Sequence, residues 1–526
     1  MVLFAPHGGR RFVERQPGEH KVNDLHTADL TDILAVRSGA TAIINRTRDR
    51  NELDLNRVKQ VREHASWLPA LLADTLEQEV ARAGHVTLLV IHGWNIGQPA
   101  CDIGIGLVER AGELEGARTG APTVSPRFLE EVLPGLRAAA APAGIAVTIG
   151  ARYPAAHPNN LMQLFTAGYA QDADPGIRRL GALAAAGTLD AAQLELGIPL
   201  RWPGAMRERV IDLLVNTLSD TPQTEPPARA SRPLPSRLAC RGRVTERRAL
   251  QFVHEDLFGL TAVEMSEAGS VGGRLLLSTE AGSVTLFTGE LGDRTGPRWH
   301  VPPLRYDDDG DRWHLRYEGD VLSFGSLEPF LDLENGLADG RLMAATVALE
   351  FCARGSSEPR AEPGPHGLTF GDLTGTVRLG DRTMAIRTVA LRTDGGGAAT
   401  RGLPTLRLVA PQSPFGALAL ASLSGVVHAG ELQFELAGHV EHGGEREELT
   451  GTAAVRVGDD SGTLAVQVGT RELVGRVERL IPIRRPGGPG KILHTTYGLC
   501  YFGSPPNTGW IELVTEHAIP VSAPEP

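Results

Sequence analysis

Residues 86–95 read Val-Thr-Leu-Leu-Val-Ile-His-Gly-Trp-Asn, a short apolar run that ends in histidine and glycine. A run of this length, closed by glycine, predicts a buried strand. Similar runs lie elsewhere in the first part of the chain, at Val2–Ala5, Thr41–Ile44, Ile145–Gly150 and Gln193–Gly197. Helical patterns separate them, at Leu55–Arg82, Pro126–Ala140 and Ala205–Leu218. The alternation predicts a multidomain chain whose residues 1–218 form a three-layer α/β domain with a mostly parallel sheet.

The remaining sequence has a different texture. Residues 219–248 are rich in proline and arginine, which predicts a linker because proline interrupts helices and central strands. Beyond it, short apolar runs with a two-residue period are broken by Gly, Asp or Pro, a pattern typical of all-β barrels or sandwiches. The length of this half suggests two β-rich units, which we place at 249–375 and 376–526.

The amino-acid composition argues against several classes of protein. Of 526 residues, 41% are hydrophobic and 22% are charged, and the formal net charge is -11, so we expect no nucleic-acid partner. The four cysteines are far apart, without the spacing of a zinc knuckle or a disulfide framework. The sequence contains no long uninterrupted apolar run, so we expect no membrane association and a cytoplasmic location.

Two strands of the predicted sheet end in histidine. His7 follows the run Val2–Ala5 and precedes Gly8-Gly9, and His92 follows the run that ends at Ile91. A single histidine beside a turn is more often structural than a ligand. Two of them at strand ends of one open sheet, where such folds place their sites, favour a metal centre.

Three further polar groups follow predicted strands. The stretch Arg46-Thr-Arg48-Asp-Arg50-Asn-Glu-Leu-Asp54-Leu-Asn56-Arg57 is either a guanidinium clamp for a carboxylate or a salt-bridged surface loop. Arg152 lies in a second polar turn, and Asn95 follows the strand that carries His92. Glu195 stands between leucines on a strand, so it either faces solvent or is buried with a raised pKa and a proton-transfer role.

The order of these motifs resembles the N-formylglutamate amidohydrolase family, which is related to zinc carboxypeptidases and aspartoacylases. The resemblance covers about residues 1–218, and its most specific piece is Arg50-x3-Asp54-Leu-Asn56-Arg57. It implies one zinc ion per chain, held by His7, His92 and a carboxylate, with Glu195 as general base. It also implies that Arg50 and Arg57 bind a substrate carboxylate, Arg50 acting in catalysis. We add Arg48, Asn56, Arg152 and Asn95 as candidate substrate-binding residues.

The sequence departs from that family at the metal ligands. The family's acidic ligand usually comes three residues after the first histidine, where this chain has Arg10. We therefore assign the third ligand to Glu14, with Asp29 and Asp32 as alternatives. The strand before His92 also lacks the acid that usually stands two residues earlier, since Val90 occupies that place.

The implied reaction is metal-dependent hydrolysis of an amide bond in an N-acyl amino acid or a small acidic peptide. The alternative is a non-catalytic protein that binds carboxylates or lipids through a degenerate hydrolase domain. The β-rich half resembles tandem lipocalin-like proteins, which implies an apolar ligand in a barrel. The expected partners are therefore a small carboxylate-bearing substrate and an apolar molecule.

Overall fold

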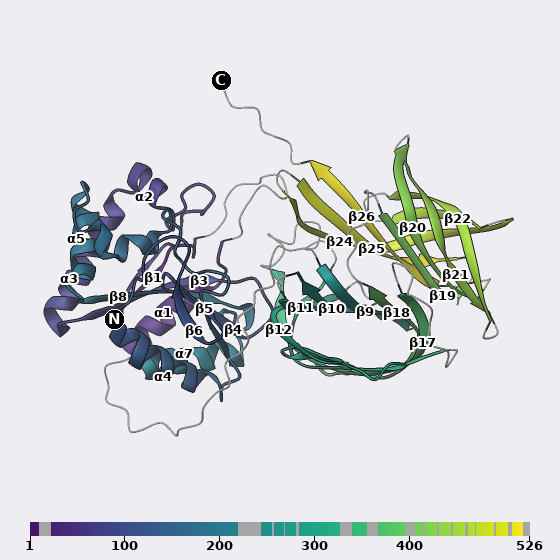
Figure 1. Cartoon of the computed structure of the whole chain (residues 1–526), viewed down its shortest axis with the longest axis horizontal. Helices are drawn as coiled ribbons and strands as arrows, with labels where there is room; N and C mark the ends of the chain where they lie inside the picture. The colour runs from purple at the N-terminus through teal and green to yellow at the C-terminus, as the bar shows by residue number, and fades with distance from the viewer. Residues whose placement is uncertain are drawn as a thin grey trace. The chain divides into compact units, whose positions relative to one another are not determined.

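The computed structural model describes residues 1–9 and 23–218, and most of 244–518. Within 244–518 the residues left out are 255–256, 268, 280–282, 327–338, 355–366, 396–404, 414–415, 429–430, 443–444, 458–460, 469, 489–490 and 503–507. The chain divides into two units at residues 238–239. The first unit is α/β and the second consists of antiparallel strands (Figure 1), so the predicted fold class is confirmed.

A six-stranded sheet forms the middle layer of the first unit, in the spatial order β2-β1-β3-β8-β4-β7. Its strands are β1 Val2–Ala5, β2 Thr41–Ile44, β3 Val86–Gly93, β4 Ala100–Gly104, β7 Ala146–Ile149 and β8 Leu189–Leu196. Strands β2, β1, β3 and β8 are parallel to one another, whereas β4 is antiparallel to β8. The sheet is therefore mixed, with most of its pairings parallel.

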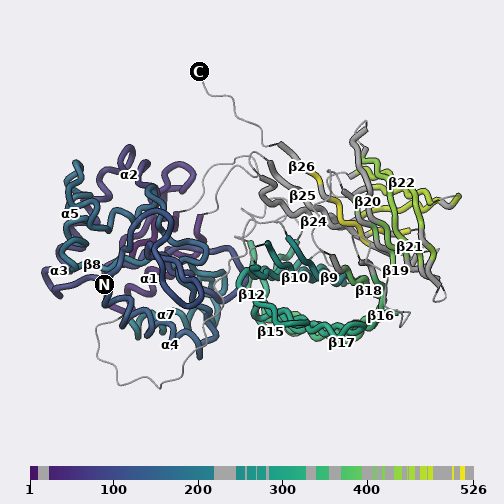
Figure 2. Tube along the Cα trace, in the orientation of Figure 1, coloured from purple at the N-terminus to yellow at the C-terminus, as the bar shows by residue number. Residues whose placement is uncertain are grey.

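Helices cover both faces of this sheet (Figure 2). The α-helices are α1 Thr27–Ser38, α2 Val58–His64, α3 Trp67–Ala83, α4 Leu133–Ala140, α5 Pro175–Ala185, α6 Ile198–Arg201 and α7 Ala205–Leu218. The shorter turns are η1 Phe128–Val132, η2 Leu161–Phe165 and η3 Ala167–Tyr169, and β5 Leu107–Arg110 forms a hairpin with β6 Glu113–Gly116.

Alternate residues of the central strands enter two separate cores. Phe4 and Val90 pack with α2, α3 and α5, whereas Leu3 and Ile91 pack with α1, α4 and α7. Because neighbouring residues of a strand point to opposite faces, a continuous apolar run such as β3 can bury both of its sides. The three-layer arrangement follows from that pattern.

The principal difference from the predicted elements is β4. Its sequence, Ala-Cys-Asp-Ile-Gly, has a buried aspartate at its centre and no long apolar run, so periodicity gives little sign of a strand. The long helical pattern at Leu55–Arg82 is also divided in the structure, since α2 ends at His64 and α3 begins at Trp67.

The second unit contains two closed barrels. The strands of the first are β9 Val244–His254, β10 Leu257–Ser266, β11 Val271–Thr279, β12 Val284–Thr295, β13 Arg298–Val301, β14 Leu304–Asp308, β15 Arg312–Phe324, β16 Arg341–Ala353, β17 Gly367–Leu379 and β18 Arg382–Gly395. The strands of the second are β19 Thr405–Ser413, β20 Gly416–His428, β21 Glu431–His442, β22 Glu445–Val457, β23 Ser461–Val468, β24 Arg471–Gly488, β25 Lys491–Tyr501 and β26 Thr508–Ala518.

The boundary that we expected after residue 375 falls inside β17 and needs correction. Strand β18 pairs with both β17 and β9 and so closes the first barrel. The change of barrel therefore lies between Gly395 and Thr405. Strand β9 likewise begins at Val244, inside the predicted linker 219–248, whose residues 219–243 lie outside the described part of the chain.

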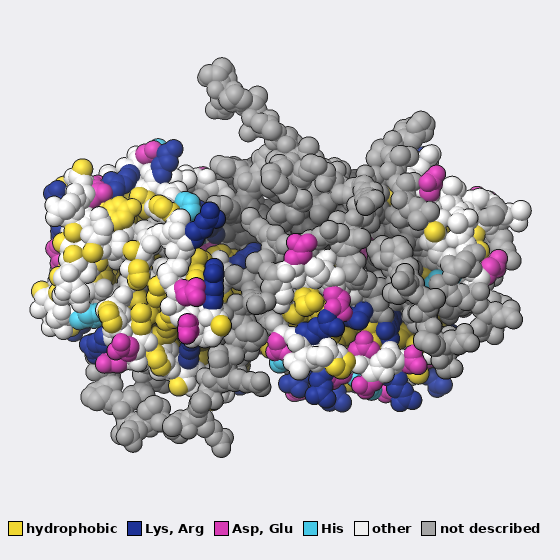
Figure 3. Space-filling model, viewed as in Figure 1, with side chains coloured by type: hydrophobic (Ala, Val, Ile, Leu, Met, Phe, Trp, Pro, Cys, Tyr) yellow, Lys and Arg dark blue, Asp and Glu magenta, His cyan; other side chains and the backbone are white. Residues whose placement is uncertain are grey.

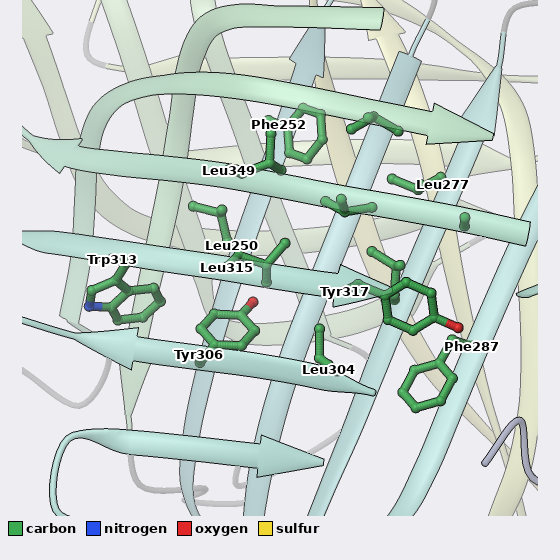
Figure 4. Packing of buried hydrophobic residues seen from close by; sticks show 14 of the residues in the cluster. Leu250, Phe252, Leu277, Phe287, Leu304, Tyr306, Trp313, Leu315, Tyr317 and Leu349 are labelled. Atoms are coloured by element: carbon green, nitrogen blue, oxygen red, sulfur yellow. The ribbon is translucent and has the colours of Figure 1, made fainter. Parts of the chain in front are cut away.

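Large side chains occupy the interior of the first barrel (Figure 4). Trp313 packs on Tyr306 with ring centroids 5.8 Å apart, and Phe287 packs on Tyr317 at 5.1 Å. These rings belong to one cluster of buried hydrophobic side chains. The apolar ligand implied by the lipocalin-like resemblance stays a prediction.

Charged side chains of both signs intermingle on the face of the first barrel seen in Figure 3. Arg312 pairs with Glu350 and Arg354 pairs with Asp372 across neighbouring strands. Exposed pairs of this kind contribute little stability, but they prevent a surface patch with charges of a single sign.

Among the helices of the described residues, none has the length and the apolar composition that a membrane-spanning helix needs.

Two adjacent leucines of α3 provide a test of the packing. Leu72 is fully buried in the core, whereas Leu71 is 41% exposed. We expect Leu72→Ala to lower the free energy of unfolding of the first unit by about 2–5 kcal/mol. We expect Leu71→Ala to lower it by less than about 1 kcal/mol. Urea denaturation followed by helical circular dichroism measures both changes, and equal losses would contradict this packing.

Candidate metal centre

Strand β1 places His7 at one edge of the sheet, and glycines allow the chain to turn there. His7 is fully buried. A Cβ atom on Gly8 would lie 2.7 Å from the Cβ of Ala28, and one on Gly9 would lie 2.1 Å from the carbonyl oxygen of Arg48. Only glycine fits such close approaches, so the Gly8-Gly9 pair lets the strand end pass between α1 and the loop after β2.

His92 reaches the same place from the neighbouring strand. Strands β1 and β3 are parallel with Phe4 opposite Val90, so their carboxyl ends lie side by side. The imidazole rings of His7 and His92 are 4.7 Å apart between centroids and lie edge to face. The structure thus brings together the two histidines that the sequence analysis selected.

Asp24 completes a cluster with these histidines. Its Oδ2 atom lies 3.2 Å from Nδ1 of His7 and 2.9 Å from Nδ1 of His92. The turn that carries Asp24 is anchored on β1, because its backbone N–H donates to the carbonyl oxygen of His7 at 3.0 Å. Thr27 donates its hydroxyl to the Asp24 carbonyl oxygen at 2.6 Å. His7, Asp24 and His92 are all buried, and together they could hold a metal ion.

Asp24 was not among the acids that the sequence analysis considered as the third ligand. The exposed Asp29 lies 3.6 Å from His26, and Asp32 pairs with Arg46 on the surface, so neither joins the histidines. Glu14 lies outside the described residues. Asp24 stands three residues before α1, and its spacing from His7 matches no motif that we recognised.

The second nitrogen of His7 contacts another carboxylate. Nε2 lies 2.7 Å from Oδ1 of Asp54, which also accepts the backbone N–H of Asn56 at 3.0 Å. Burial favours a raised pKa for Asp54, but hydrogen bonding to His7 and the charges of His7 and Arg50 hold that pKa well below its usual range. With Nε2 directed to Asp54, Nδ1 of His7 is available to a metal, as metal-bound histidines require.

The donor atoms of the cluster lie within 4.8 Å of one another, close enough to hold a metal ion. Two imidazole nitrogens and one carboxylate oxygen are ligands that zinc prefers. In a tetrahedral site with bonds of about 2.0–2.1 Å, neighbouring ligand atoms lie about 3.3 Å apart, close to the 2.9 and 3.2 Å found here. Burial lowers the pKa of His92 to about 4, which leaves its imidazole neutral at pH 7, as metal binding requires.

Acidic and basic side chains gather around the cluster. The buried acids are Asp24, Asp54, Asp102 and Glu195. The guanidinium groups of Arg50, Arg57 and Arg201 lie near them. Because the raised pKa of Glu195 favours its neutral form, these groups nearly balance in charge, and charge balance alone does not call for a cation.

Arg50 contacts the cluster directly. Its Nη1 atom donates to Oδ1 of Asp24 at 3.0 Å, and its side chain is 18% exposed. Burial would raise the pKa of Asp24, but His7, His92 and Arg50 hold it well below the usual range. Asp24 is therefore ionised, as a ligand for a cation must be.

Glu195 lies beside His92, because β3 and β8 pair with these two residues in register. It is buried, which decides between the two alternatives left open by the sequence. Burial, followed by the negative charge of Asp24, raises the pKa of Glu195 well above its usual value, while Arg50 acts in the opposite direction. A carboxyl group in this environment suits proton transfer.

A network of amide side chains links Glu195 to the Asp-Leu-Asn-Arg motif. Gln193 donates Nε2–H to Oε1 of Glu195 at 2.8 Å, and its own Oε1 accepts from Asn160 at 3.3 Å and from Asn56 at 3.5 Å. Sequence analysis singled out neither Gln193 nor Asn160 for this role. The period of the strand does place Gln193 on the same face as Glu195.

The remaining candidate residues lie at different distances from the cluster. Arg57 has a 39% exposed side chain and lies 3.5 Å from Asp54, at the rim of the site. Arg48 is exposed, and Asn95 accepts a hydrogen bond from Arg201. Arg152 donates its backbone N–H to the buried Asp102 at 2.7 Å. Arg57 and Asn56 therefore lie near the cluster, and Asn95 contacts Arg201.

Within the described part of the chain, His92 lacks a hydrogen-bond partner at its second ring nitrogen. Its Nε2 atom is buried and has no hydrogen-bond partner among the described residues. Val90 stands two residues before His92, where the resemblance described in the sequence analysis implies an acid. The two histidines thus differ at their second nitrogen, since Asp54 contacts that of His7 and no described residue bonds to that of His92.

Comparisons with known proteins assign no family to this chain. No protein-family model matches the chain, and no curated protein matches it significantly. A crystal structure of a "putative AttH" from Nitrosomonas europaea is 10% identical, and the alignment covers 52% of this chain and 92% of the other with a TM-score of 0.30. A similarity of this size carries no argument about fold or function.

A glycine substitution tests how the His7 turn is built. We expect Gly9→Ala to lower the stability of the first unit by about 1–3 kcal/mol, because its Cβ atom would collide with the Arg48 carbonyl oxygen. Gly116→Ala is the control, since a Cβ atom there would meet nothing within 4 Å. Thermal unfolding compares the two variants, and an unchanged Gly9→Ala protein would contradict the close approach.

Proposed function

We propose that the first unit is a zinc-dependent amidohydrolase acting on an N-acyl amino acid or a small acidic peptide. The observation that carries this proposal is the buried His7–Asp24–His92 cluster, with Asp54 behind His7 and Glu195 on the adjacent strand. The resemblance of the motif order to N-formylglutamate amidohydrolases agrees with it. When bound, a zinc ion supplies Lewis-acid polarisation of water and carbonyl oxygen.

The surrounding side chains have distinct roles in this proposal. Glu195 accepts the proton of the attacking water and returns it to the leaving amine, a use that its raised pKa favours. Gln193 holds the carboxyl group of Glu195 in place through their 2.8 Å hydrogen bond. Arg50, next to Asp24, stabilises the negative charge that develops on the carbonyl oxygen.

In this proposal, residues at the rim of the site bind the carboxylate of the substrate. Arg57 is half-exposed, and its guanidinium can pair with a carboxylate through two hydrogen bonds. Asn56, adjacent in sequence, directs its amide toward Gln193. A substrate carboxylate held by Arg57 would thus be linked through Asn56 and Gln193 to the general base.

Metal content is the first test of the proposal. We expect about one zinc ion per chain in the wild type, its loss in His92→Ala, and its retention in Glu195→Gln and in the control His85→Ala. His85 pairs with Asp190 and lies outside the cluster, so it controls for removal of an imidazole. Elemental analysis measures all four proteins. A wild type that stays metal-free in the presence of zinc would favour the non-catalytic carboxylate-binding alternative.

Hydrolysis of N-formyl and N-acetyl amino acids tests the roles of two side chains. We expect Glu195→Gln to lower kcat by a factor of about 10²–10⁴. We expect Arg57→Met to raise KM by about ten- to a hundredfold with little change in kcat, because it removes a charge-assisted contact made equally before and during the reaction.

Arg62→Met is the control for Arg57→Met, since Arg62 pairs with Asp172 on the surface. A lower kcat with unchanged KM in Arg57→Met would refute the assignment of Arg57 to substrate binding. Wild-type turnover in Glu195→Gln would refute its role as general base.

A further inference from the structure

Arg201 is a buried cation directly behind the cluster. It ends the short helix α6, and only 1% of its surface is exposed. Its Nη1 atom donates to the carbonyl oxygen of Leu25 at 2.6 Å, and Nε donates to that of Leu196 at 3.2 Å. Nη2 donates to Oδ1 of Asn95. All three acceptors are neutral.

These three acceptors belong to the three segments that meet at the site. Leu25 follows Asp24, Leu196 follows Glu195, and Asn95 lies three residues after His92. The packing is tight, because a Cβ atom on Gly93 would lie 2.9 Å from Cζ of Arg201 and 3.1 Å from Cβ of Asp24. Arg201 therefore contacts all three segments, two through backbone carbonyl oxygens and one through the Asn95 side chain, without entering the cluster itself.

Burial of an arginine without a directly paired carboxylate is costly, so nearby charge must offset it. Burial lowers the pKa of Arg201 to about 10, and the charges of Asp24 and Glu195 oppose that change. Arg201 thus remains protonated at neutral pH. Its charge offsets part of the negative charge of Asp24.

We propose that Arg201 is a positioning residue that holds the Asp24 turn against β3 and β8, so that Asp24 is in place before a metal arrives. The inference rests on the proposed function, since it takes His7, Asp24 and His92 as metal ligands. A purely structural arginine would affect unfolding alone. A positioning arginine affects the affinity and geometry of the metal site in a folded protein.

The test measures metal binding by the full-length protein after removal of metal with a chelator. Zinc affinity is obtained by competition with a chromogenic chelator, and the geometry of the site by the visible absorption of bound Co²⁺. We expect Arg201→Met to bind zinc about 10–100-fold more weakly than wild type, with an altered Co²⁺ spectrum. We expect Arg201→Lys to fall between them, because it keeps the charge and loses part of the hydrogen bonding.

The matched control is Arg137→Met. Arg137 has a side chain that is 28% exposed and forms an ion pair with Glu109, outside the cluster. This variant should keep wild-type zinc affinity even if its melting temperature falls. Wild-type affinity and spectrum in a folded Arg201→Met protein would overturn the inference.

Two further outcomes are decisive. If Arg201→Met does not fold, unchanged affinity in a folded Arg201→Lys protein overturns the inference, and weaker affinity at wild-type melting temperature supports it. If the wild type itself binds neither zinc nor Co²⁺, the proposed function fails and the inference falls with it. Zinc binding by wild type with no effect of Arg201 rejects the inference alone.

Discussion

The candidate site depends on the parallel pairing of β1, β3 and β8. This pairing brings three carboxyl strand ends to one edge of the sheet, and they carry His7, His92 and Glu195. Because the register places His92 opposite Glu195, a shift by one residue would turn one of these side chains to the other face. The two hydrophobic cores hold that register, since alternate residues of each strand are buried on opposite sides.

Electrostatics at this edge follow from the same geometry. Carboxylates from a turn, a loop and two strands gather where little water reaches them, so each alters the ionisation of its neighbours. The fully buried Asp102 is satisfied locally, because it accepts hydrogen bonds from Thr148 and from three backbone N–H groups of the next loop. Asp24 is different, since its partners are the imidazoles and a guanidinium that surround the cluster.

The features that could be predicted from the sequence are those that lie at the ends of strands. Short apolar runs that close on histidine and glycine indicated the sheet, its carboxyl edge and the two imidazoles. The acidic partner escaped prediction because Asp24 sits in a turn whose position depends on a backbone hydrogen bond to His7. Strand β4 escaped for another reason, since its apolar residues are interrupted by Asp102. Contacts such as Gln193 with Asn160 join distant segments, and no local pattern encodes them.

The cluster residues are synthesised well before Glu195 and Arg201. The three residues of the cluster lie within the first 92 positions, and β1 pairs directly with β3. Glu195 and Arg201 join only when β8 and α6 are added about a hundred residues later. During synthesis from the N-terminus, the three cluster residues therefore emerge before Glu195 and Arg201, and the contacts of Arg201 with the Asp24 turn form last. On the proposal for Arg201, a metal ion that reached the unfinished chain would meet a less ordered Asp24 turn than one that reached the complete first unit.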